Sequence, residues 1–363
     1  MIKRQSGILA DGEIAGLWDA GAVAAPRPLD PDQIQPASLD LRLGDTAYRV
    51  RASFLPGAGM TVAEKLQRFK LHEISLAGGA VLETGCVYIV PLLEQLSLPP
   101  EFSASTNPKS STGRLDIFTR VIADGAREFD HVPAGYSGPL YIEVSPRTFP
   151  IVVRMGSRLS QIRFRHGDSV LGGSDLETLH KMETLVSCEE PDISDAGIAL
   201  SIDLTGDDDG LIGYRGKHHT GVIDVDRRGA YDLLDYWEPL LGRGSCELIL
   251  DPDEFYILVS REAVHVPPLY AAEMRPYDPL VGEFRVHYAG FFDPGFGHAA
   301  AGGLGSRAVL EVRSHEVPFI LEHGQTVGRL VYERMLERPK ALYGADLGSN
   351  YQAQRLKLSK HFR

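Results

Sequence analysis

The sequence predicts an all-β protein with a few short helices, built as two copies of one small domain. Two observations predict the β class. The chain is interrupted by 38 glycines and 23 prolines, and short apolar segments such as CVYIVPL, LYIEV, FYILVS and AVLEV stand between these turn signals. This spacing is typical of a sandwich or closed barrel rather than of a parallel α/β sheet. A third observation, an internal repeat, gives the number of copies.

The repeat covers one long stretch without a gap. IEVSPRTFPIVVRMGSRLSQIRF, from position 142, aligns with LEVRSHEVPFILEHGQTVGRLVY, from position 310, so that Glu143 corresponds to Glu311. The same offset, which we call the repeat offset, aligns two Pro-Pro pairs farther upstream. We also expect SLDL at Ser38 to correspond to SIDL at Ser201, at a slightly different offset. An ordered series of matches of this kind indicates a tandem duplication.

The duplication predicts the domain boundaries. We expect one β domain over residues 1–170 and a second over 190–363, joined by a helix and linker over 171–189. Helical periodicity is sparse, and it is clearest in ILADGEIAGLWDAGAV near the start and in Asp175–Val186. At 363 residues the chain is long enough for two hydrophobic cores.

The composition excludes several classes of partner. The chain has 37 basic and 49 acidic side chains, a net charge of -12, which argues against polymeric nucleic acid or anionic lipid as ligand. No apolar run is long enough to span a membrane, so we expect a cytoplasmic protein. Cys86, Cys188 and Cys246 are widely separated and lack metal-ligand spacing, so the protein itself is expected to hold no metal. A small anionic ligand remains compatible with these data.

One candidate binding motif occurs in the first copy only. The stretch KSSTGR, from Lys109 to Arg114, places two cations and three hydroxyls close together, whereas the second copy reads YDPLVG from Tyr277. Its composition is that of an ordinary surface turn. Closely spaced hydroxyls, backbone N–H groups and cations also suit a phosphate.

A second candidate occurs in the second copy only. In AGFFDPGF, from Ala289, an Asp-Pro-Gly turn joins two apolar segments, which predicts a β-hairpin. Such a hairpin can present backbone N–H and C=O groups to a nucleobase. The first copy has the looser ADGAREFDHVPAGYSG at this place.

Glu143 and Glu311 each stand within an apolar strand, as YIEV and VLEV. Alternation along a strand favours an outward, solvated carboxylate. An inward carboxylate would have its pKa raised by burial, which would suit it for proton transfer.

Taken together, IQPASLDLRLGD, SSTGR, AGFFDPGF and LEV resemble the motifs of the dCTP deaminase family, a branch of the dUTPase-like β fold, in its double-length form. The resemblance implies two tandem dUTPase-like β-barrel or jelly-roll domains. It also implies a hydrolase that deaminates dCTP to dUTP and ammonia and so supplies dUTP for dUMP and dTTP synthesis.

The family's motifs assign roles in the first copy. Ser110, Ser111 and Arg114 match the serines and the arginine of the family's RSSxxR segment. Lys109 replaces its first arginine, which keeps the charge and weakens bidentate phosphate recognition. The resemblance implies that Ser110 and Arg114 are catalytic, whereas Lys109 and Ser111 bind the substrate.

In the second copy, Glu311 matches the catalytic glutamate, with Glu143 as its alternative. Ala289 matches the alanine whose backbone carbonyl faces the reactive water, and Asp293 matches the substrate-binding aspartate of the hairpin.

The C-terminal segment YGADLGSNYQAQ resembles the part of the family that closes over the nucleotide. Tyr343 and Gln354 match its substrate-binding residues, and Asn350 stands where a lysine is usual. HAAAGGLGSR, between Gly297 and Ala308, is longer than the family's link, and we expect a loop extension there, with a mobile flap as the alternative.

The split of the motifs predicts a composite site in which both copies supply residues, within one chain or between two. The zinc deaminase signatures H-x-E and P-C-x-x-C are absent, so we expect no cofactor for the base chemistry, with Mg²⁺ bound only through the substrate triphosphate. The family implies a homo-oligomer with a trimer-like arrangement of domains. Two alternatives remain: a bifunctional enzyme that releases dUMP, and a catalytically inactive nucleotide-binding protein.

Overall fold

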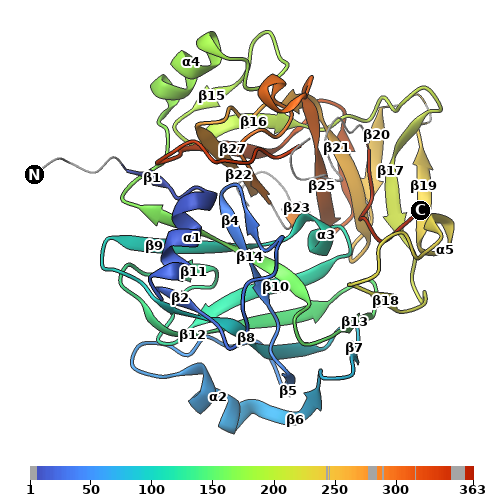
Figure 1. Ribbon diagram of the computed structural model, residues 1–363. Helices are drawn as coiled ribbons and strands as arrows, with labels where there is room; N and C mark the ends of the chain where they lie inside the picture. The colour runs from blue at the N-terminus through green and yellow to red at the C-terminus, as the bar shows by residue number, and fades with distance from the viewer. Residues whose placement is uncertain are drawn as a thin grey trace, which may run out of the picture.

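The computed structural model of the chain describes residues 6–242, 244, 246–276, 284–287, 290–314, 316–344 and 356–363, with the backbone alone at 276 and 284–287. Strands dominate both halves of the chain, and the helices are few and short (Figure 1). The predicted fold class is therefore confirmed. The first half occupies the lower part of Figure 1 and the second half the upper part.

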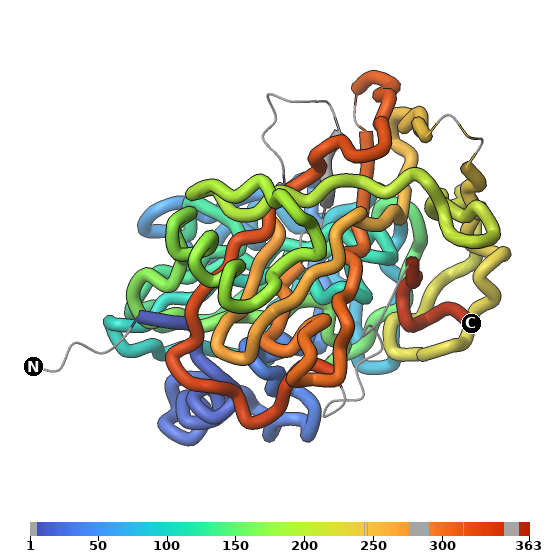
Figure 2. Tube along the Cα trace, turned by 90° about the horizontal axis from the view of Figure 1, so that it is seen from above, coloured from blue at the N-terminus to red at the C-terminus, as the bar shows by residue number. Residues whose placement is uncertain are grey.

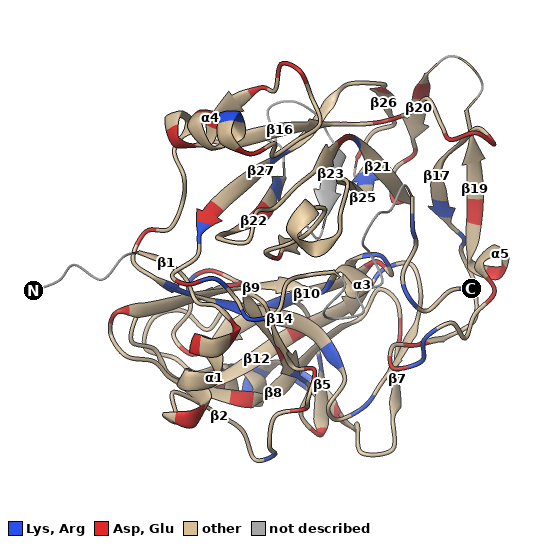
Figure 3. Ribbon diagram, turned by 45° about the horizontal axis from the view of Figure 1, so that its top comes forward, with Lys and Arg blue, Asp and Glu red and all other residues tan. Residues whose placement is uncertain are grey.

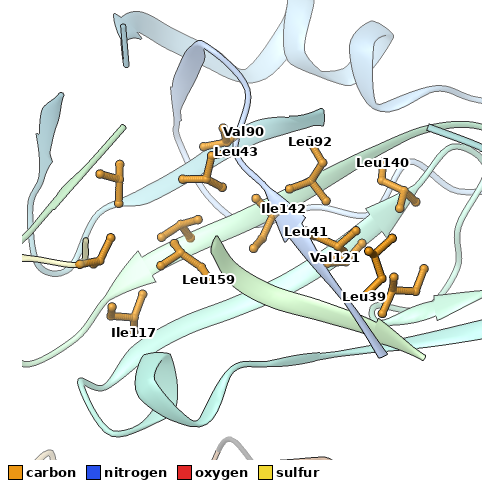
Figure 4. Close-up of a cluster of buried hydrophobic side chains, with 14 of the residues drawn as sticks. Leu39, Leu41, Leu43, Val90, Leu92, Ile117, Val121, Leu140, Ile142 and Leu159 are labelled. Carbon is orange, nitrogen blue, oxygen red and sulfur yellow. The ribbon is translucent and has the colours of Figure 1, made fainter. Parts of the chain in front are cut away.

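The first half consists mainly of two sheets. One contains, in spatial order, β11 (His131–Val132), β9 (Phe102–Pro108), β14 (Arg158–His166), β4 (Ser38–Arg42) and β3 (Ile34–Gln35), with β1 (Gly7–Ile8) also paired to β14. The other contains β10 (Ile117–Ala123), β12 (Ser137–Pro146), β8 (Val87–Ser97), β5 (Thr46–Val50) and β6 (Lys70–Ser75), with β2 (Val23–Ala24) also paired to β8. Buried aliphatic side chains from strands of both sheets meet between them (Figure 4). This packing is that of a β-sandwich.

The second half repeats this plan. One sheet contains β15 (Ile193–Ser194), β16 (Gly197–Ser201), β27 (Thr326–Arg334), β22 (Tyr270–Pro276) and β24 (Phe291–Phe292). The other contains β19 (Trp237–Leu241), β17 (Leu211–Gly216), β21 (Phe255–Val264), β25 (Ser306–Ser314) and β23 (Phe284–His287). A two-stranded sheet pairs β20 (Glu247–Leu250) with β26 (Phe319–Glu322). β22 begins and ends at the repeat offset from β9, and β27 does so from β14, as the repeat predicts.

The correspondence expected between Ser38 and Ser201 is wrong. Leu41 lies opposite Ser160 on β14, and Leu200 lies opposite Gly328, which is the counterpart of Ser160 at the repeat offset. Leu200 is therefore the counterpart of Leu41, so SIDL begins directly after the segment that matches SLDL. The strand register, and not the local similarity of four letters, fixes which residues share a face.

Buried glutamates confirm this corrected alignment. Glu94 accepts a hydrogen bond of 2.8 Å from the backbone N–H of Arg42, and Glu262 accepts one of 2.8 Å from that of Ser201. The repeat offset also relates the two glutamates to each other. Arg42 and Ser201 therefore occupy equivalent places in the two copies.

The helices cover edges and connections. They are α1 (Asp11–Asp19), α2 (Val62–Phe69), α3 (Ser110–Gly113), α4 (Gly173–Met182), α5 (Leu233–Tyr236) and the 3-10 turn η2 (Ala299–Ala301). The two helices expected from the periodicity correspond to α1 and α4. α4 ends before the predicted Val186, because Val186 pairs with Val264 as an isolated bridge. Leu176 and Leu179 of α4 pack in the hydrophobic core of the second half.

Parts of the second half complete the core of the first. β18 (Ile223–Asp224) pairs in parallel with β13 (Ile151–Val153), which in turn pairs with β7 (Ala80–Leu82). The ring of Trp237 lies 5.3 Å from that of Phe149 and is fully buried. The C-terminal segment lies beside the segment that contains β18 and α5 (Figures 1 and 2). The two copies are thus interlocked, and a site between them has walls from both.

Candidate active site

A cavity of about 320 Å³ lies where the two halves meet. Lys109, Ser110, Ser111 and Arg114 line it from the first half. Asp293, Glu311 and Tyr343 line it from the second half. The structure therefore brings the two sets of predicted residues together within one chain.

A single helical turn positions the residues from the first half. The N–H groups of Thr112 and Gly113 both donate to the carbonyl of Lys109, at 2.8 and 3.0 Å, and this closes α3 directly after β9. The turn buries Ser111 and leaves Ser110 half-buried at the cavity. Arg114 follows the turn and is buried, with its Nη1 donating to the carbonyl of Lys357 at 2.8 Å. The KSSTGR motif therefore forms part of the cavity wall and is not an ordinary surface turn.

Glu311 is buried, with 4% of its surface exposed. It lies on β25, which pairs with β21 on one side and β23 on the other. Burial raises the pKa of Glu311 to about 8, and the nearby guanidinium of Arg114 acts in the opposite direction. Alternation favoured an exposed carboxylate here. It failed because one face of β25 packs on the second core and the other faces the cavity.

Asp293 is the acidic residue of the predicted turn. Arg163, which is fully buried on β14 of the first half, donates its Nη2 to Oδ1 of Asp293 at 3.1 Å. Burial raises the pKa of Asp293, whereas Arg163 opposes that rise. The guanidinium carbon of Arg163 lies 3.9 Å from the centre of the Phe291 ring. Arg163 thus ties the turn of one half to the sheet of the other.

The turn after β24 is fixed by its backbone. Gly295 has a φ of 98°, a conformation that favours glycine. A Cβ atom at this position would lie 2.9 Å from Cβ of Leu342. The N–H of Tyr343 donates to the carbonyl of Pro294 at 2.8 Å, which holds Tyr343 against the turn. The rings of Phe296 and Tyr343 lie 5.7 Å apart.

Several predicted positions lie outside the described residues. They are Ala289, Asn350, Gln354 and the YDPLVG segment from Tyr277. The long link after Gly297 contains η2 and a turn that exposes 94% of Leu304, and none of residues 298–305 lines the cavity.

Glu143, the alternative catalytic residue, is also buried but does not line the cavity. Arg120 donates two hydrogen bonds to its Oε1, at 3.1 and 2.7 Å. The structure therefore places Glu311, and not Glu143, beside Ser110 and Arg114.

The sequence analysis missed three basic residues that line the cavity: Arg158, Arg228 and Lys360. Basic segments lie along β14 and beside α3, at the level where the two halves meet (Figure 3). Alternation along RLSQIRF could not have placed Arg158 correctly, because a register shift lies between Arg158 and Ser160, and Leu159 and Ile162 both pack in the core. Arg228 and Lys360 lie in segments without a local motif, and only the packing between the halves brings them to the cavity.

The described part of the chain contains no cluster of three His, Cys, Asp or Glu side chains placed to hold a metal ion. Over the same residues, no helix is both long and apolar enough to cross a membrane.

The fold and the cavity define a β protein with a composite ligand site between two tandem domains. The family model "2'-deoxycytidine 5'-triphosphate deaminase (DCD) N-terminal domain" matches residues 5–168, and the model of the corresponding C-terminal domain matches residues 173–362. The chain therefore belongs to the dCTP deaminase family.

Individual proteins agree with this assignment. The chain is similar to a "dCTP deaminase, dUMP-forming" from Coprothermobacter proteolyticus, with 30% identity over 43% of this chain and 81% of the relative. It is similar to a "dCTP deaminase" from Halorubrum lacusprofundi, with 30% identity over 43% of this chain and 76% of the relative. A crystal structure of 2'-deoxycytidine 5'-triphosphate deaminase from Agrobacterium tumefaciens shares 72% identity and covers 92% of this chain and 100% of its own, with a TM-score of 0.88.

Proposed function

We propose that the chain catalyses the hydrolytic deamination of dCTP to dUTP and ammonia, and so supplies dUTP for dUMP and dTTP synthesis. One observation carries this proposal: Glu311, Ser110 and Arg114 come from different halves of the chain and line the same cavity. Membership of the dCTP deaminase family supports the identity of the substrate.

Glu311 acts as the general base and then as the general acid. Its carboxylate takes a proton from water as the water oxygen bonds to C4 of cytosine, and it passes that proton to N3. It then takes the proton of the new hydroxyl on C4 and passes it to the amino group, so that C4 becomes a carbonyl carbon. The C4–N bond then breaks and ammonia leaves. A pKa of about 8 leaves Glu311 able to hold a proton near neutral pH. Such acid–base catalysis contributes on the order of a hundredfold to ten-thousandfold in rate.

The first half orients the reacting groups. Ser110 lines the cavity and positions the water together with the carbonyl of Ala289. Arg114 lies close enough to Glu311 to influence its charge, and it orders Ser110 and Glu311. The carbonyl of Lys357 fixes the orientation of the guanidinium.

The remaining residues bind the nucleotide. Asp293 and the aromatic turn around it contact the nucleoside, whereas Lys109 and Ser111 contact the phosphates. Tyr343 packs on Phe296 at the wall of the cavity, and Tyr343 and Gln354 both bind the nucleotide. Mg²⁺ binds to the triphosphate of the substrate and not to a protein side chain. The protein works in the cytoplasm as a homo-oligomer with a trimer-like arrangement of domains.

A second candidate function is the combined deamination and pyrophosphate release that yields dUMP. The name of the Coprothermobacter relative favours it, since that protein is dUMP-forming.

Ion-exchange analysis of the products formed from dCTP separates the two activities. dUTP and ammonia support deamination alone, and dUMP supports the combined reaction. Hydrolysis of dUTP with no attack on dCTP would overturn both, and tight dCTP binding without ammonia would indicate an inactive binding protein.

A further inference from the structure

We propose that Asp116 and Arg313 are positioning residues for the reaction: their ion pair joins the two halves beside the cavity and holds Arg114 in its place near Glu311. Neither member of the pair lines the cavity, so both act through their neighbours in the chain. Asp116 stands two positions after Arg114, and Arg313 stands two positions after Glu311. The inference rests on the proposed function, because it concerns the proposed general base.

Two charged side chains of β25 face the first half. Leu310 and Val312 pack in the core of the second half, so alternation along the strand puts Glu311 and Arg313 together on the opposite face. The pairing of β25 with β21 is regular at these positions. The two charges therefore have a fixed spacing along one face of a strand.

The segment after α3 carries the complementary charges. Leu115, between Arg114 and Asp116, is fully buried in the core of the first half. The N–H of Asp116 donates to the carbonyl of Gly113 at 2.8 Å, and its carbonyl accepts from the N–H of Arg147 at 3.0 Å. The backbone of Asp116 is thus held by α3 on one side and by the segment after β12 on the other.

The carboxylate of Asp116 meets Arg313 at the boundary between the halves, where α3 lies below β25 in Figure 1. Nη2 of Arg313 donates to Oδ2 of Asp116, and Nη1 donates to the carbonyl of Asp253 in its own half. The hydroxyl of Thr148 donates to Oδ2 of Asp116 at 2.6 Å and accepts from Nη2 of Arg313 at 3.2 Å. Both charged residues are buried, with 1% and 5% of their surfaces exposed. Because a buried charge that loses its partner is costly, the pair resists separation.

The backbone of Asp116 has an uncommon conformation. Its φ is 54°, in the left-handed region that aspartate and asparagine adopt more readily than most other residues with a side chain. Such a conformation persists where the surrounding contacts impose it, and it is typical of functional sites. The bonds to Gly113, Arg147 and Arg313 impose it here, two residues after Arg114.

The repeat shows that the pair belongs to one arrangement of the copies. At the repeat offset, Arg313 corresponds to Ser145 and Asp116 corresponds to Phe284, and neither counterpart carries a charge. Exchanging the roles of the two copies would therefore not recreate the ion pair. It accompanies the arrangement that forms the cavity.

The test replaces each member of the pair and uses Arg154→Gln as the control. Arg154 also bonds across the halves, to Asp224 at 2.7 and 2.8 Å, and it does not line the cavity. Asp116→Asn keeps the shape and the backbone preference, and Arg313→Gln removes the guanidinium. Each should lower kcat for ammonia release about tenfold because Arg114 is misplaced, while KM for dCTP changes less than about threefold. The control should stay within about twofold of the unsubstituted chain, and an equal loss in the control would overturn the proposal.

The pH profile separates positioning from a direct effect of charge. Arg114 lowers the pKa of Glu311, so a guanidinium that is held less firmly leaves that pKa higher. The profile of kcat/KM should therefore move to higher pH in both variants. Loss of the negative charge in Asp116→Asn would by itself lower the pKa of a nearby carboxyl and move the profile to lower pH. An unchanged profile in Asp116→Asn, or one at lower pH, would overturn the proposal. The residues that line the cavity, and His287 opposite Glu311 on β23, are the same in all of these chains.

Thermal unfolding of each chain is recorded, because removing one member leaves a buried charge without its partner. If Arg313→Gln does not fold, the double variant Asp116→Asn/Arg313→Gln takes its place, since it removes both charges. The same loss in kcat and the same shift of the profile are expected from it. Activity equal to that of the unsubstituted chain would overturn the proposal.

Difference infrared spectroscopy gives a measurement that needs no turnover. Glu311→Gln identifies the band of the protonated Glu311 carboxyl, and that band should titrate at higher pH in Asp116→Asn than in the unsubstituted chain. If this shift occurs but the unsubstituted chain releases no ammonia from dCTP, the proposed function fails and the positioning role stands. Ammonia release without the shift would sink the positioning role alone.

Discussion

Glu143 and Glu311 occupy the same place in the two copies and have different surroundings. The register sets Glu143 opposite Ile89 and Glu311 opposite Ile257, and the repeat offset relates the members of both pairs. On the other neighbouring strand, Arg120 lies opposite Glu143, and His287 lies opposite Glu311. Both glutamates are buried, so burial alone does not distinguish a catalytic carboxylate from a structural one.

The arginine accounts for the difference. Arg120 gives Glu143 a fixed, hydrogen-bonded counterion, and its guanidinium also stacks on the ring of Phe129, with 3.6 Å to the ring centre. Within the described residues, Glu311 has no cation at ion-pair distance, and its pKa is raised to about 8. The duplication thus left one glutamate locked in an ion pair and the other able to exchange a proton.

Replacing each glutamate in turn tests this comparison most strongly. Glu311→Gln should lower kcat by about a thousandfold because it removes the proton carrier. Binding of dCTP, measured by calorimetry, should weaken by less than about tenfold, since the amide has the same shape. Ammonia release gives kcat. Loss of turnover in Glu143→Gln with retention in Glu311→Gln would show that the active copy has been assigned wrongly.

Arg114→Ala should have the next largest effect, a loss in kcat on the order of a hundredfold, because Ser110 and Glu311 lose the group that orders them. Ammonia release again provides the measurement. Arg114→Lys keeps the charge without the planar fork and should recover only part of the rate. Full activity in Arg114→Lys would mean that charge alone, and not geometry, is required.

Mixing Arg114→Ala chains with Glu311→Gln chains tests whether these two residues act in a site within one chain. Both residues line one cavity within one chain, so the mixture should remain as inactive as its components after subunit exchange. A mixture of either variant with unsubstituted chains controls for the exchange conditions. Recovery of activity in the mixture of variants would place the working site between chains.

The dependence of rate on pH should follow the raised pKa of Glu311. In the proposed mechanism the carboxylate is the base, and burial raises its pKa to about 8, so the base form is scarce below that pH. kcat/KM, which reports the free enzyme, should therefore fall about tenfold for each pH unit below 8 and level off above it. Initial rates of ammonia release at low dCTP concentration measure it from pH 6 to 9. A flat profile over that range would mean that burial does not set the titration of Glu311.

Motifs with a local signature could be predicted from the sequence. The repeat predicted corresponding strands in the two halves, and KSSTGR, AGFFDPGF and LEV predicted cavity residues through their resemblance to a family. The β-hairpin expected in AGFFDPGF is wrong, because β24 pairs with β22 and the turn after it leads to η2 and not to a strand paired with β24. Alternation places Glu311 on the face of β25 opposite the core, but it could not show that this face is buried, because the cavity between the two halves covers it. The similarity of SLDL and SIDL gave the wrong counterpart for Ser38, because the pairing with the neighbouring strand sets the register.

Residues that act across the two halves were missed. Arg163 reaches Asp293 over 130 positions of sequence, and Lys360 reaches the cavity only because the last residues pack on the first core. Their neighbours in the sequence give no sign of these contacts. Contacts of this kind depend on how the two halves pack together, and the sequence of one half does not determine that packing.

The smallest expected effect is that of Glu143→Gln, and it concerns stability rather than rate. The amide leaves Arg120 without its counterion, and a part of the guanidinium is solvated, since 27% of the side chain is exposed. The free energy of unfolding should therefore fall by about 1–2 kcal/mol, less than the cost of breaking a fully buried pair. Urea denaturation measures it, and kcat should stay within about twofold of the unsubstituted chain.

The matched variant is Arg120→Gln in the same chain, because the double replacement removes both charges. If the ion pair is structural, the double variant should be no less stable than Glu143→Gln alone, since no unpaired charge remains in it. Strictly additive losses would mean that the two side chains stabilise the fold independently. A fall in kcat that exceeds the loss of folded protein would mean that the first copy still takes part in the reaction, and the contrast between the two glutamates would then fail.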